Sequence, residues 1–410
     1  MGRYYREDLK LKLLSLALLV CAAARGELLT PVWVALADGD QAVARVVVSD
    51  PASCPTAIID GVSHPLTLRR PVPDGLRPAC EVAIPGGTRS ASVNGQALRL
   101  PKASGARVVV LGDTGCRIKG ERVQECANPD EWPFERLAMS AAAAQPDVVV
   151  HVGDYLYREE KCPREAQCGN TPGGDIWEAW NADFFAPAAK LLSAAPWAFA
   201  RGNHEACSRA WRGWFYYLDP RPWTNACDSY SPPYAVKQGS FELVVFDSSS
   251  VTTDKVDQEQ VAQYAAQLAG VHVNNAWLVA HHPFWGIKTD PQGGPSVPLV
   301  TSLADAWTRA QPHGINLVVS GHVHMFALLS FNGDRPPQLV AGDSGADLAA
   351  PAGAVNGLNL TGASVVAGES QRQFGFSVLS RSKDGWDLVL NDRVGKPVVT
   401  CNIRHGRTSC

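Results

Sequence analysis

Short apolar strands that alternate with amphipathic helices make up most of the chain after residue 105. Six apolar runs have the length and composition of buried strands, and the first of them is apolar on both faces, as in a sheet covered by helices. They span residues 107–111, 148–152, 197–200, 241–246, 276–280 and 315–319. Helical stretches separate them over residues 132–144 and 175–193, and again from about residues 257 and 299. This order predicts an α/β fold with layered sheets.

The first part of the chain has a different pattern. Residues 27–104 contain short β-branched runs, such as 32–36 and 42–48, separated by Asp-Gly, Pro-Gly-Gly and Asn-Gly turn sequences. The pattern changes at residues 101–105. We therefore predict a small all-β, sandwich-like domain over 27–104 and a second domain over 105–410. The tail from Pro337 contains strands and no clear helix, so we expect it to add to a second sheet.

The N-terminus has the features of a signal peptide. Basic residues precede the apolar run 13–24, and small residues follow at plausible cleavage positions. An uncleaved anchor is the alternative, but the run is shorter than the roughly 20 residues that span a bilayer. We predict a signal peptide over residues 1–26, no stable membrane span after its removal, and a secreted or periplasmic protein.

Composition narrows the class of partner. The 37 Lys and Arg residues against 40 Asp and Glu give a net charge of −3, which argues against a nucleic acid or an anionic membrane as the main partner. At 46% hydrophobic and 19% charged residues, the chain is typical of a folded globular protein rather than a disordered one.

Eleven cysteines indicate an oxidising compartment. Removing the signal peptide removes Cys21 and leaves an even number, without the CxxC spacing of a structural zinc site. Sequence does not fix the connectivity, but the entropy of loop closure favours pairing between neighbours. We therefore predict five disulfides between successive cysteines, at positions 54 and 80, 116 and 126, 162 and 168, 207 and 227, and 401 and 410.

Metal-binding side chains follow five of the predicted strands. A single Gly-Asp or His after a strand is usually part of a turn. Turns do not require histidine, however, and a cluster of His and Asp at strand ends indicates a metal or catalytic site. The five segments are Gly112-Asp113-Thr114-Gly115, Gly153-Asp154-Tyr155-Leu156-Tyr157, Gly202-Asn203-His204-Glu205, His281-His282-Pro283 and Gly321-His322-Val323-His324.

The order GDxG, GDxxY, GNHE, HxP and GHxH resembles the calcineurin-like binuclear metallophosphoesterases, specifically their purple acid phosphatase branch. The resemblance extends from Gly112 to His324, about half of the chain. It implies a four-layer αββα sandwich that holds two metal ions, Fe(III) together with Fe, Zn or Mn. The implied ferric ligands are Asp113, Asp154, Tyr157 and His324. The implied ligands of the second metal are the bridging Asp154, Asn203, His281 and His322, and His204 is the implied proton donor.

This ligand set suits phosphate-ester cleavage. Two metals can neutralise the phosphoryl oxygens and supply a bridging hydroxide, and a Tyr157 phenolate favours a ferric ion that permits hydrolysis at acid pH. We predict an exported acid phosphatase-like hydrolase acting on small phosphate monoesters. One alternative is a phosphodiesterase or nucleotide-cleaving hydrolase of the same superfamily. A non-catalytic secreted protein that binds metal or phosphate is another.

Several neighbouring residues stay open at this stage. His282 competes with His281 as a ligand, and the spacing to Pro283 favours His281. Arg158, Arg201 and Glu205 either contact the substrate phosphate, support the ligands through contacts behind them, or form ion pairs. The plant and animal enzymes of the family carry a further histidine after HxP, whereas residues 285–298 contain none. This departure leaves His204 as the main candidate for the acid step.

Overall fold

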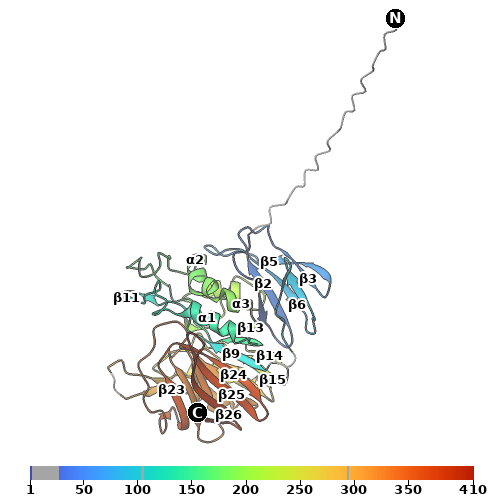
Figure 1. Ribbon diagram of the computed structural model, residues 1–410. Coiled ribbons are helices and arrows are strands. Elements are labelled where there is room, and N and C mark those ends of the chain that lie inside the picture. Colours follow the sequence, from blue (N-terminus) through green and yellow to red (C-terminus); the bar gives the residue numbers. More distant parts are fainter. Residues whose placement is uncertain (2–26, 103–105, 293–294) are drawn as a thin grey trace.

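The computed structural model describes residues 1, 27–102, 106–292 and 295–410 (Figure 1). The predicted signal peptide, apart from its first residue, therefore lies outside the described residues. Within the described part of the chain, no helix has the length and apolar character needed to cross a membrane.

An eleven-stranded sheet runs through the molecule, and its central strands β9, β12, β13 and β1 are parallel. From edge to edge the order is β27 (Arg407–Ser409), β26 (Pro397–Arg404), β25 (Gly385–Asp392), β24 (Gly375–Ser382), β9 (Arg107–Leu111), β12 (Val148–His151), β13 (Trp197–Phe199), β1 (Trp33–Leu36), β2 (Ala42–Val47), β6 (Ala79–Ile84) and β5 (Thr67–Leu68).

A second sheet of eight strands has a parallel centre formed by β15, β16, β19 and β21. Its order is β14 (Tyr234–Gln238), β15 (Phe241–Val245), β16 (Ala276–Val279), β19 (Ile315–Ser320), β21 (Gln338–Ala341), β20 (Phe326–Phe331), β23 (Ala363–Gln371) and β22 (Asn359–Leu360). Three small sheets are formed by β10 (Ile118–Lys119) with β11 (Arg122–Val123), by β17 (Gly286–Lys288) with β18 (Val297–Leu299), and by β4 (Val62–Pro65), β3 (Thr56–Ile59), β7 (Ala91–Val93) and β8 (Gln96–Ala97).

The two large sheets pack face to face, and helices cover both outer faces. The core between the sheets includes Val110, Val150, Val279 and Leu317. On the outer face of the first sheet lie α1 (Phe134–Ala143), α2 (Trp177–Trp180), a π-helical segment (Asn181–Phe185) and α3 (Ala186–Leu192). On that of the second lie α5 (Gln258–Ala269) and α6 (Leu303–Ala310). The predicted α/β class and four-layer αββα sandwich are therefore confirmed.

The N-terminal strands are part of the first sheet rather than a separate unit, which differs from the boundary predicted at residue 104. Strand β1 pairs in parallel with β13, and β2, β6 and β5 continue outward from it (Figure 1, blue strands). The small β3–β4–β7–β8 sheet packs against these strands through Ala57 and Val93. Backbone hydrogen bonding favours this arrangement because β1 covers the otherwise open edge of β13.

A largely buried ion cluster joins the same strands to residues 217–219. Arg45 of β2 pairs with Glu81 of β6 at 2.7 Å and donates to the carbonyl oxygens of Tyr217 and Asp219. Arg69 also pairs with Glu81, at 2.5 Å. Tyr217 lies in the π-helical stretch Trp214–Leu218, which follows α4 (Trp211–Gly213), and Asp219 comes directly after that stretch. These contacts therefore tie the N-terminal strands to that region.

The C-terminal tail divides between the sheets, so the expectation that it adds to a second sheet holds for only part of it. Strands β21, β22 and β23 join the second sheet, but β24 pairs antiparallel with β9 in the first, followed by β25, β26 and β27 (Figure 1, red strands). Strand β24 closes the edge of β9 that faces away from β12. Apolar runs alone do not indicate which sheet edge a strand will cover.

All ten cysteines described by the structure form disulfides, in the five neighbour pairs that loop-closure entropy predicts. Three of these bonds, Cys116–Cys126, Cys162–Cys168 and Cys207–Cys227, begin within a few residues of a predicted ligand loop.

Candidate metal centre

The predicted ligands of both sheets meet at one edge, where the parallel strands end. In the first sheet, β9, β12 and β13 lead to Asp113, Asp154 and Asn203. In the second, β16 leads to His281, and β19 leads to His322 and His324. The carboxyl ends of parallel strands are the usual location of sites in open α/β sheets. Packing the two sheets face to face brings these two sets of side chains together.

The phenol oxygen of Tyr157 lies at the centre of one group of side chains. It is 3.0 Å from Oδ1 of Asp113 and 2.9 Å from Oδ2 of Asp154. It is also 2.9 Å from Nε2 of His324. Burial, reinforced by the two carboxylates, raises the pKa of Tyr157 well above its ordinary value. The phenol is therefore protonated in the metal-free protein. A metal that binds the phenolate oxygen must displace that proton.

The side-chain oxygen of Asn203 lies at the centre of a second group. It is 3.0 Å from Nε2 of His281 and 2.9 Å from Nδ1 of His322. His281 Nε2 is in turn 3.2 Å from Oδ2 of Asp154. Asp154 therefore contacts both groups, which is the position a bridging carboxylate requires.

Backbone carbonyls orient two of the histidines. Nδ1 of His281 lies 2.9 Å from the Val152 oxygen, and Nδ1 of His324 lies 2.6 Å from the Asp347 oxygen. Since a carbonyl accepts the proton on Nδ1, Nε2 of each ring is left as the free donor atom facing the cluster. Burial and the charge on neighbouring histidines lower the pKa of His322 well below its ordinary value, so this ring is neutral, as a metal ligand must be.

In the metal-free protein, the negative charge of Asp154 is balanced by a proton held on His281. Burial opposes the ionisation of Asp154, but His281 and His204 outweigh it and hold the pKa of this carboxyl well below its usual range. Conversely, burial disfavours the His281 cation, but Asp154 raises the pKa of His281 to about 9. A metal cation at this position would take over the role of the His281 proton.

Three of the predicted ligands adopt the left-handed backbone conformation. The φ angles are 54° for Asp113, 59° for Asp154 and 68° for His322. This conformation costs on the order of 1 kcal/mol for a residue with a side chain, and such strain tends to gather at functional sites. Hydrogen bonds between the loops stabilise this conformation. The His322 N–H donates to Asp113 Oδ2 at 2.9 Å, and the His204 N–H donates to Asp154 Oδ1 at 2.9 Å.

The glycines of the motifs leave space for these carboxylates. A Cβ atom on Gly202 would lie 2.0 Å from Oδ1 of Asp154, and one on Gly321 would lie 2.4 Å from Oδ2 of Asp113. Both glycines are needed for close approach between a ligand of one strand and the backbone of the next.

Two buried carboxylates outside the ligand set hold the loops. Glu205 accepts backbone N–H groups from Asp154, Tyr155, Leu156 and Gly202. Asp183, on the π-helical segment, accepts the N–H groups of Cys116 and Tyr157 at 3.2 and 2.8 Å. The sequence offered Glu205 as a contact of the substrate, as a support of the ligands or as part of an ion pair, and the structure shows the supporting contacts. Asp183 was not identified, because its contacts with two distant loops have no local signal in the sequence.

His204 lies next to the Tyr157 ring, with ring centroids 3.8 Å apart. Its Nε2 is 3.8 Å from Oδ2 of Asp154, so this nitrogen faces the cluster. Its Nδ1 is 2.5 Å from Oε1 of Glu159 and 3.1 Å from the Leu156 oxygen. Burial lowers the pKa of His204, and Asp154 and Glu159 oppose that effect.

His282 lies beside the site rather than at its centre. Its backbone N–H donates to Ser248 Oγ at 2.9 Å, and its ring lies tilted against that of His322 with centroids 4.2 Å apart. Burial and the His281 charge lower the pKa of His282 to about 3. Its ligand atom lies within 4.8 Å of those of His281 and His322. The contacts of His281 with Asp154 and Asn203 favour His281 as the ligand.

The two arginines considered as substrate contacts are engaged elsewhere. Arg158 is buried, pairs with Asp183 at 2.6 Å and donates to the Cys168 carbonyl. Arg201 is buried, pairs with Asp247 at 3.1 Å and donates to the Glu205 and Asp228 carbonyls. Because their hydrogen-bonding groups already have protein partners, we do not propose either as a phosphate contact.

The donor set fits two metal ions. Ligand atoms of Asp113, Asp154 and His281 lie within 4.8 Å of one another. Carboxylate, phenol and amide oxygens together with imidazoles suit iron, zinc or manganese. One ion would be held by Asp113, Asp154, Tyr157 and His324, and the other by Asp154, Asn203, His281 and His322.

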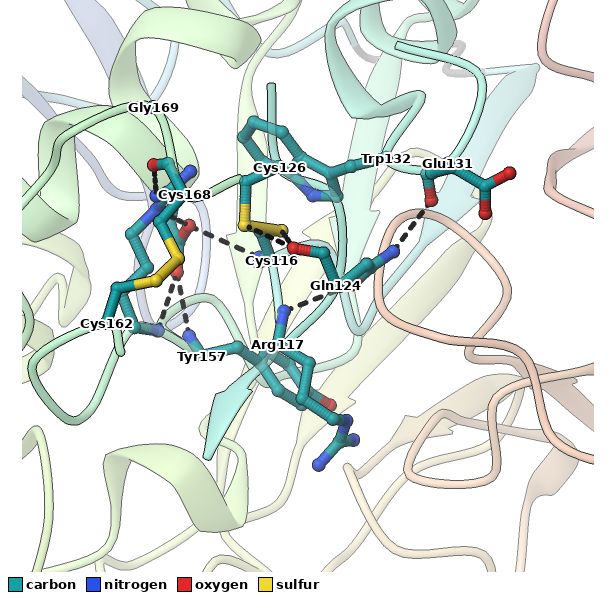
Figure 2. The surroundings of a disulfide bond; sticks show 12 residues. Cys116, Arg117, Gln124, Cys126, Glu131, Trp132, Tyr157, Cys162, Cys168 and Gly169 are labelled. Atoms are coloured by element: carbon teal, nitrogen blue, oxygen red, sulfur yellow. Dashed lines mark hydrogen bonds and ion pairs between the residues drawn. A yellow bond between two sulfur atoms is a disulfide. The ribbon is translucent and has the colours of Figure 1, made fainter. Parts of the chain in front are cut away.

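Two disulfides lie directly behind the Tyr157 side of the cluster (Figure 2). Cys116–Cys126 closes the segment after Asp113, and Cys162–Cys168 closes the segment after Tyr157. Both bonds pack in one small cluster with Ile118 and Trp132.

Comparisons with known proteins agree with this geometry. A family model described as calcineurin-like phosphoesterase matches residues 106–326. The chain is similar in fold to a purple acid phosphatase, PPD1, isolated from yellow lupin (Lupinus luteus) seeds, with 14% identity, a TM-score of 0.57 and coverage of 91% of this chain and 74% of that chain. It is also similar to PhoD, with 10% identity, a TM-score of 0.58 and coverage of 92% and 91%. No curated protein matches by sequence.

Proposed function

The chain belongs to the calcineurin-like phosphoesterase family, and we propose that it is an exported, acid phosphatase-like enzyme that hydrolyses phosphate monoesters at a binuclear centre. The observation that carries the proposal is the contact of the Tyr157 phenol with Asp113, Asp154 and His324. A phenol oxygen between two carboxylates and an imidazole favours a ferric ion. The second ion of the proposal is Fe, Zn or Mn.

Two bound metal ions would neutralise charge on the phosphoryl oxygens and activate water for in-line attack. The chain's own residues have three tasks around them. Asp154 bridges the two ligand groups and fixes their separation. Asn203 offers a neutral oxygen, which would leave a metal bound there a strong Lewis acid. Glu205 and Asp183 accept hydrogen bonds from backbone N–H groups of the ligand loops and so hold these loops in place.

We assign His204 the role of proton donor to the leaving group. Its Nε2 faces the cluster, and Glu159 holds the opposite nitrogen at 2.5 Å, which fixes the ring orientation. The proton on Nε2 would pass to the departing alkoxide oxygen. Replacing His204 with Ala is expected to lower turnover by roughly 10²-fold or more, the usual contribution of a positioned general acid, while two metals stay bound. Loss of metal together with unchanged residual activity would contradict this role.

Substrate class is tested by comparing rates on nitrophenyl phosphate and bis(nitrophenyl) phosphate with the metal-loaded full chain at acid pH. Faster cleavage of the monoester supports the proposal. Faster cleavage of the diester would instead indicate a phosphodiesterase. A protein that binds two metals and phosphate but cleaves neither ester would be a binding protein.

Export is supported by the N-terminal sequence pattern and by the five disulfides. Expression of the full chain in a secreting host, followed by N-terminal sequencing of the product, tests it. A mature N-terminus close to residue 27 is the expected result.

A further inference from the structure

Arg117 lies beside the proposed ferric ligands, although sequence reasoning did not identify it. Its Nη2 is 3.4 Å from Nε2 of His324, the nitrogen that faces the cluster. Its guanidinium carbon lies 4.8 Å from the centre of the Tyr157 ring. In Figure 2 the Arg117 side chain runs along Tyr157 and extends away from the two disulfides. The side chain is 15% exposed, so it is accessible at the rim of the site.

The backbone of Arg117 is fixed from both sides. It directly follows Cys116, which is bonded to Cys126. The Arg117 N–H donates to Oε1 of Gln124 at 3.0 Å, and the Gln124 N–H donates to the Arg117 carbonyl at 2.9 Å. The buried Gln124 side chain in turn donates to the carbonyls of Glu131 and Gly345. This support is what a preorganised binding residue requires.

The head group of Arg117 lacks a close anionic partner within the described residues. Its Nε makes no hydrogen bond there, and the nearest carboxylate oxygen, Oδ2 of Asp347, is 4.0 Å away. That carboxylate is paired with Arg122 at 3.0 Å, so it does not depend on Arg117. A cation fixed beside a site for two further cations is unfavourable unless an anion lies between them.

We propose that Arg117 is a substrate-positioning residue that binds the non-bridging phosphoryl oxygens and thereby favours dianionic monoesters over monoanionic diesters. A guanidinium presents a planar pair of N–H donors that matches two phosphate oxygens. A diester has one charge fewer, and its second substituent occupies an oxygen that the guanidinium would otherwise contact. This assignment rests on the proposed phosphatase function.

Phosphate affinity is the primary test because it does not require turnover. Inorganic phosphate is titrated calorimetrically into the metal-loaded full chain, with metal content measured for each variant. Arg117→Ala is expected to weaken phosphate binding roughly tenfold or more, since a hydrogen bond to a charged group contributes about 1.5–3 kcal/mol. Arg117→Lys is expected to bind with intermediate affinity, because it keeps the charge and loses the paired geometry.

Arg122→Ala is the matched control. Arg122 pairs with the same Asp347 but is 64% exposed and, among the residues that the structure describes, forms no hydrogen bond or ion pair with Tyr157 or His324, so its removal is expected to leave phosphate affinity within twofold of wild type. Unchanged phosphate affinity in Arg117→Ala would overturn the proposal. Loss of bound metal in Arg117→Ala would also overturn it, by showing that the residue supports the ligands instead.

A kinetic comparison separates this inference from the proposed function. With both nitrophenyl esters, Arg117→Ala is expected to lower kcat/KM for the monoester more than for the diester. Equal losses on the two esters would overturn the selectivity part of the proposal. If the wild-type protein cleaves neither ester, the phosphatase assignment fails, and the calorimetric comparison still decides whether Arg117 binds phosphate.

Discussion

The carboxylate of Glu205 accepts a hydrogen bond from the backbone N–H of Asp154 at 3.2 Å, and so holds in place the loop that carries the proposed bridging ligand. Each of its oxygens accepts two backbone N–H groups, from Tyr155 and Leu156 on one side and from Asp154 and Gly202 on the other. Burial and the charge of Asp154 raise the pKa of Glu205, whereas the N–H groups of Tyr155 and Leu156 stabilise its ionised form. The side chain thus links the loop that carries Asp154 to the loop that begins at Gly202.

Replacing Glu205 with Gln is expected to weaken metal binding about 10–100-fold, the usual effect of removing an outer partner of a metal ligand. The Gln side chain has one oxygen and one NH2 group in place of the two Glu205 oxygens. In either orientation the NH2 group points at two backbone N–H groups, which therefore lose their acceptor. Metal dialysis followed by elemental analysis measures the change. Glu178→Gln on the exposed surface of α2 is the control, and equal metal affinity in the two variants would contradict the role of Glu205.

Tyr157→Phe is expected to abolish visible absorption of the iron-loaded protein, because the phenolate oxygen is the group that would give the ferric ion its colour. The nearby Tyr155 provides the control, since its hydroxyl donates to the Ala200 carbonyl at 2.8 Å, away from the cluster. Tyr155→Phe is expected to keep the absorption. A wild-type protein that binds two metals and stays colourless would indicate a di-zinc or di-manganese centre and overturn the ferric assignment.

Asp343 is expected to make the metal-free protein less stable as pH rises. Burial, with a contribution from Asp113, raises the pKa of Asp343 to about 7, and its two carboxylate oxygens have no hydrogen-bond partner in the described part of the chain. The folded state therefore holds a proton that the unfolded chain releases near pH 4. Stability from this group is fully present below about pH 4 and is lost as pH rises toward 7.

The neutral variant Asp343→Asn removes this pH dependence. Relative to wild type, its unfolding temperature is expected to rise progressively between pH 4 and pH 7 and to level off above that range. Thermal unfolding of both metal-free proteins across this range measures the difference. A difference that does not change with pH would show that Asp343 is not protonated in the folded protein.

Removing the Cys116–Cys126 disulfide is expected to loosen the metal site as well as to lower stability by roughly 2–4 kcal/mol. This bond closes residues 116–126, which directly follow the Asp113 loop. The Cys116 N–H donates to Asp183, the same carboxylate that accepts the Tyr157 N–H. Metal affinity of the Cys116→Ser, Cys126→Ser double variant tests the coupling. The control double variant at Cys401 and Cys410 alters a disulfide of the C-terminal strands, and it is expected to keep wild-type metal affinity. Equal affinity in both double variants would show that the bond contributes to stability alone.

Local patterns in the sequence were sufficient to predict which side chains gather at the strand ends. A buried parallel strand ends at a fixed edge of its sheet, so a ligand placed directly after it, such as Asp113 or His281, is positioned by the strand itself. The same reasoning explains the disulfides, because short loops close at low entropic cost and neighbouring cysteines meet first. Both results depend on chain connectivity over a few residues, which is visible in the sequence.

Contacts between distant segments were decided only in the folded structure. Strand β1 joins the first sheet through β13, and β24 joins it through β9, although the apolar runs of both strands suit any open sheet edge. Arg158 directly follows Tyr157 in the chain, and Arg117 lies over the Tyr157 ring. Asp183 pairs with Arg158, whereas Arg117 contacts His324 of the cluster. The sequence determined which side chains follow the strands and which cysteines pair. Tertiary packing decided which charges neutralise one another, because that depends on distances between elements far apart in the chain.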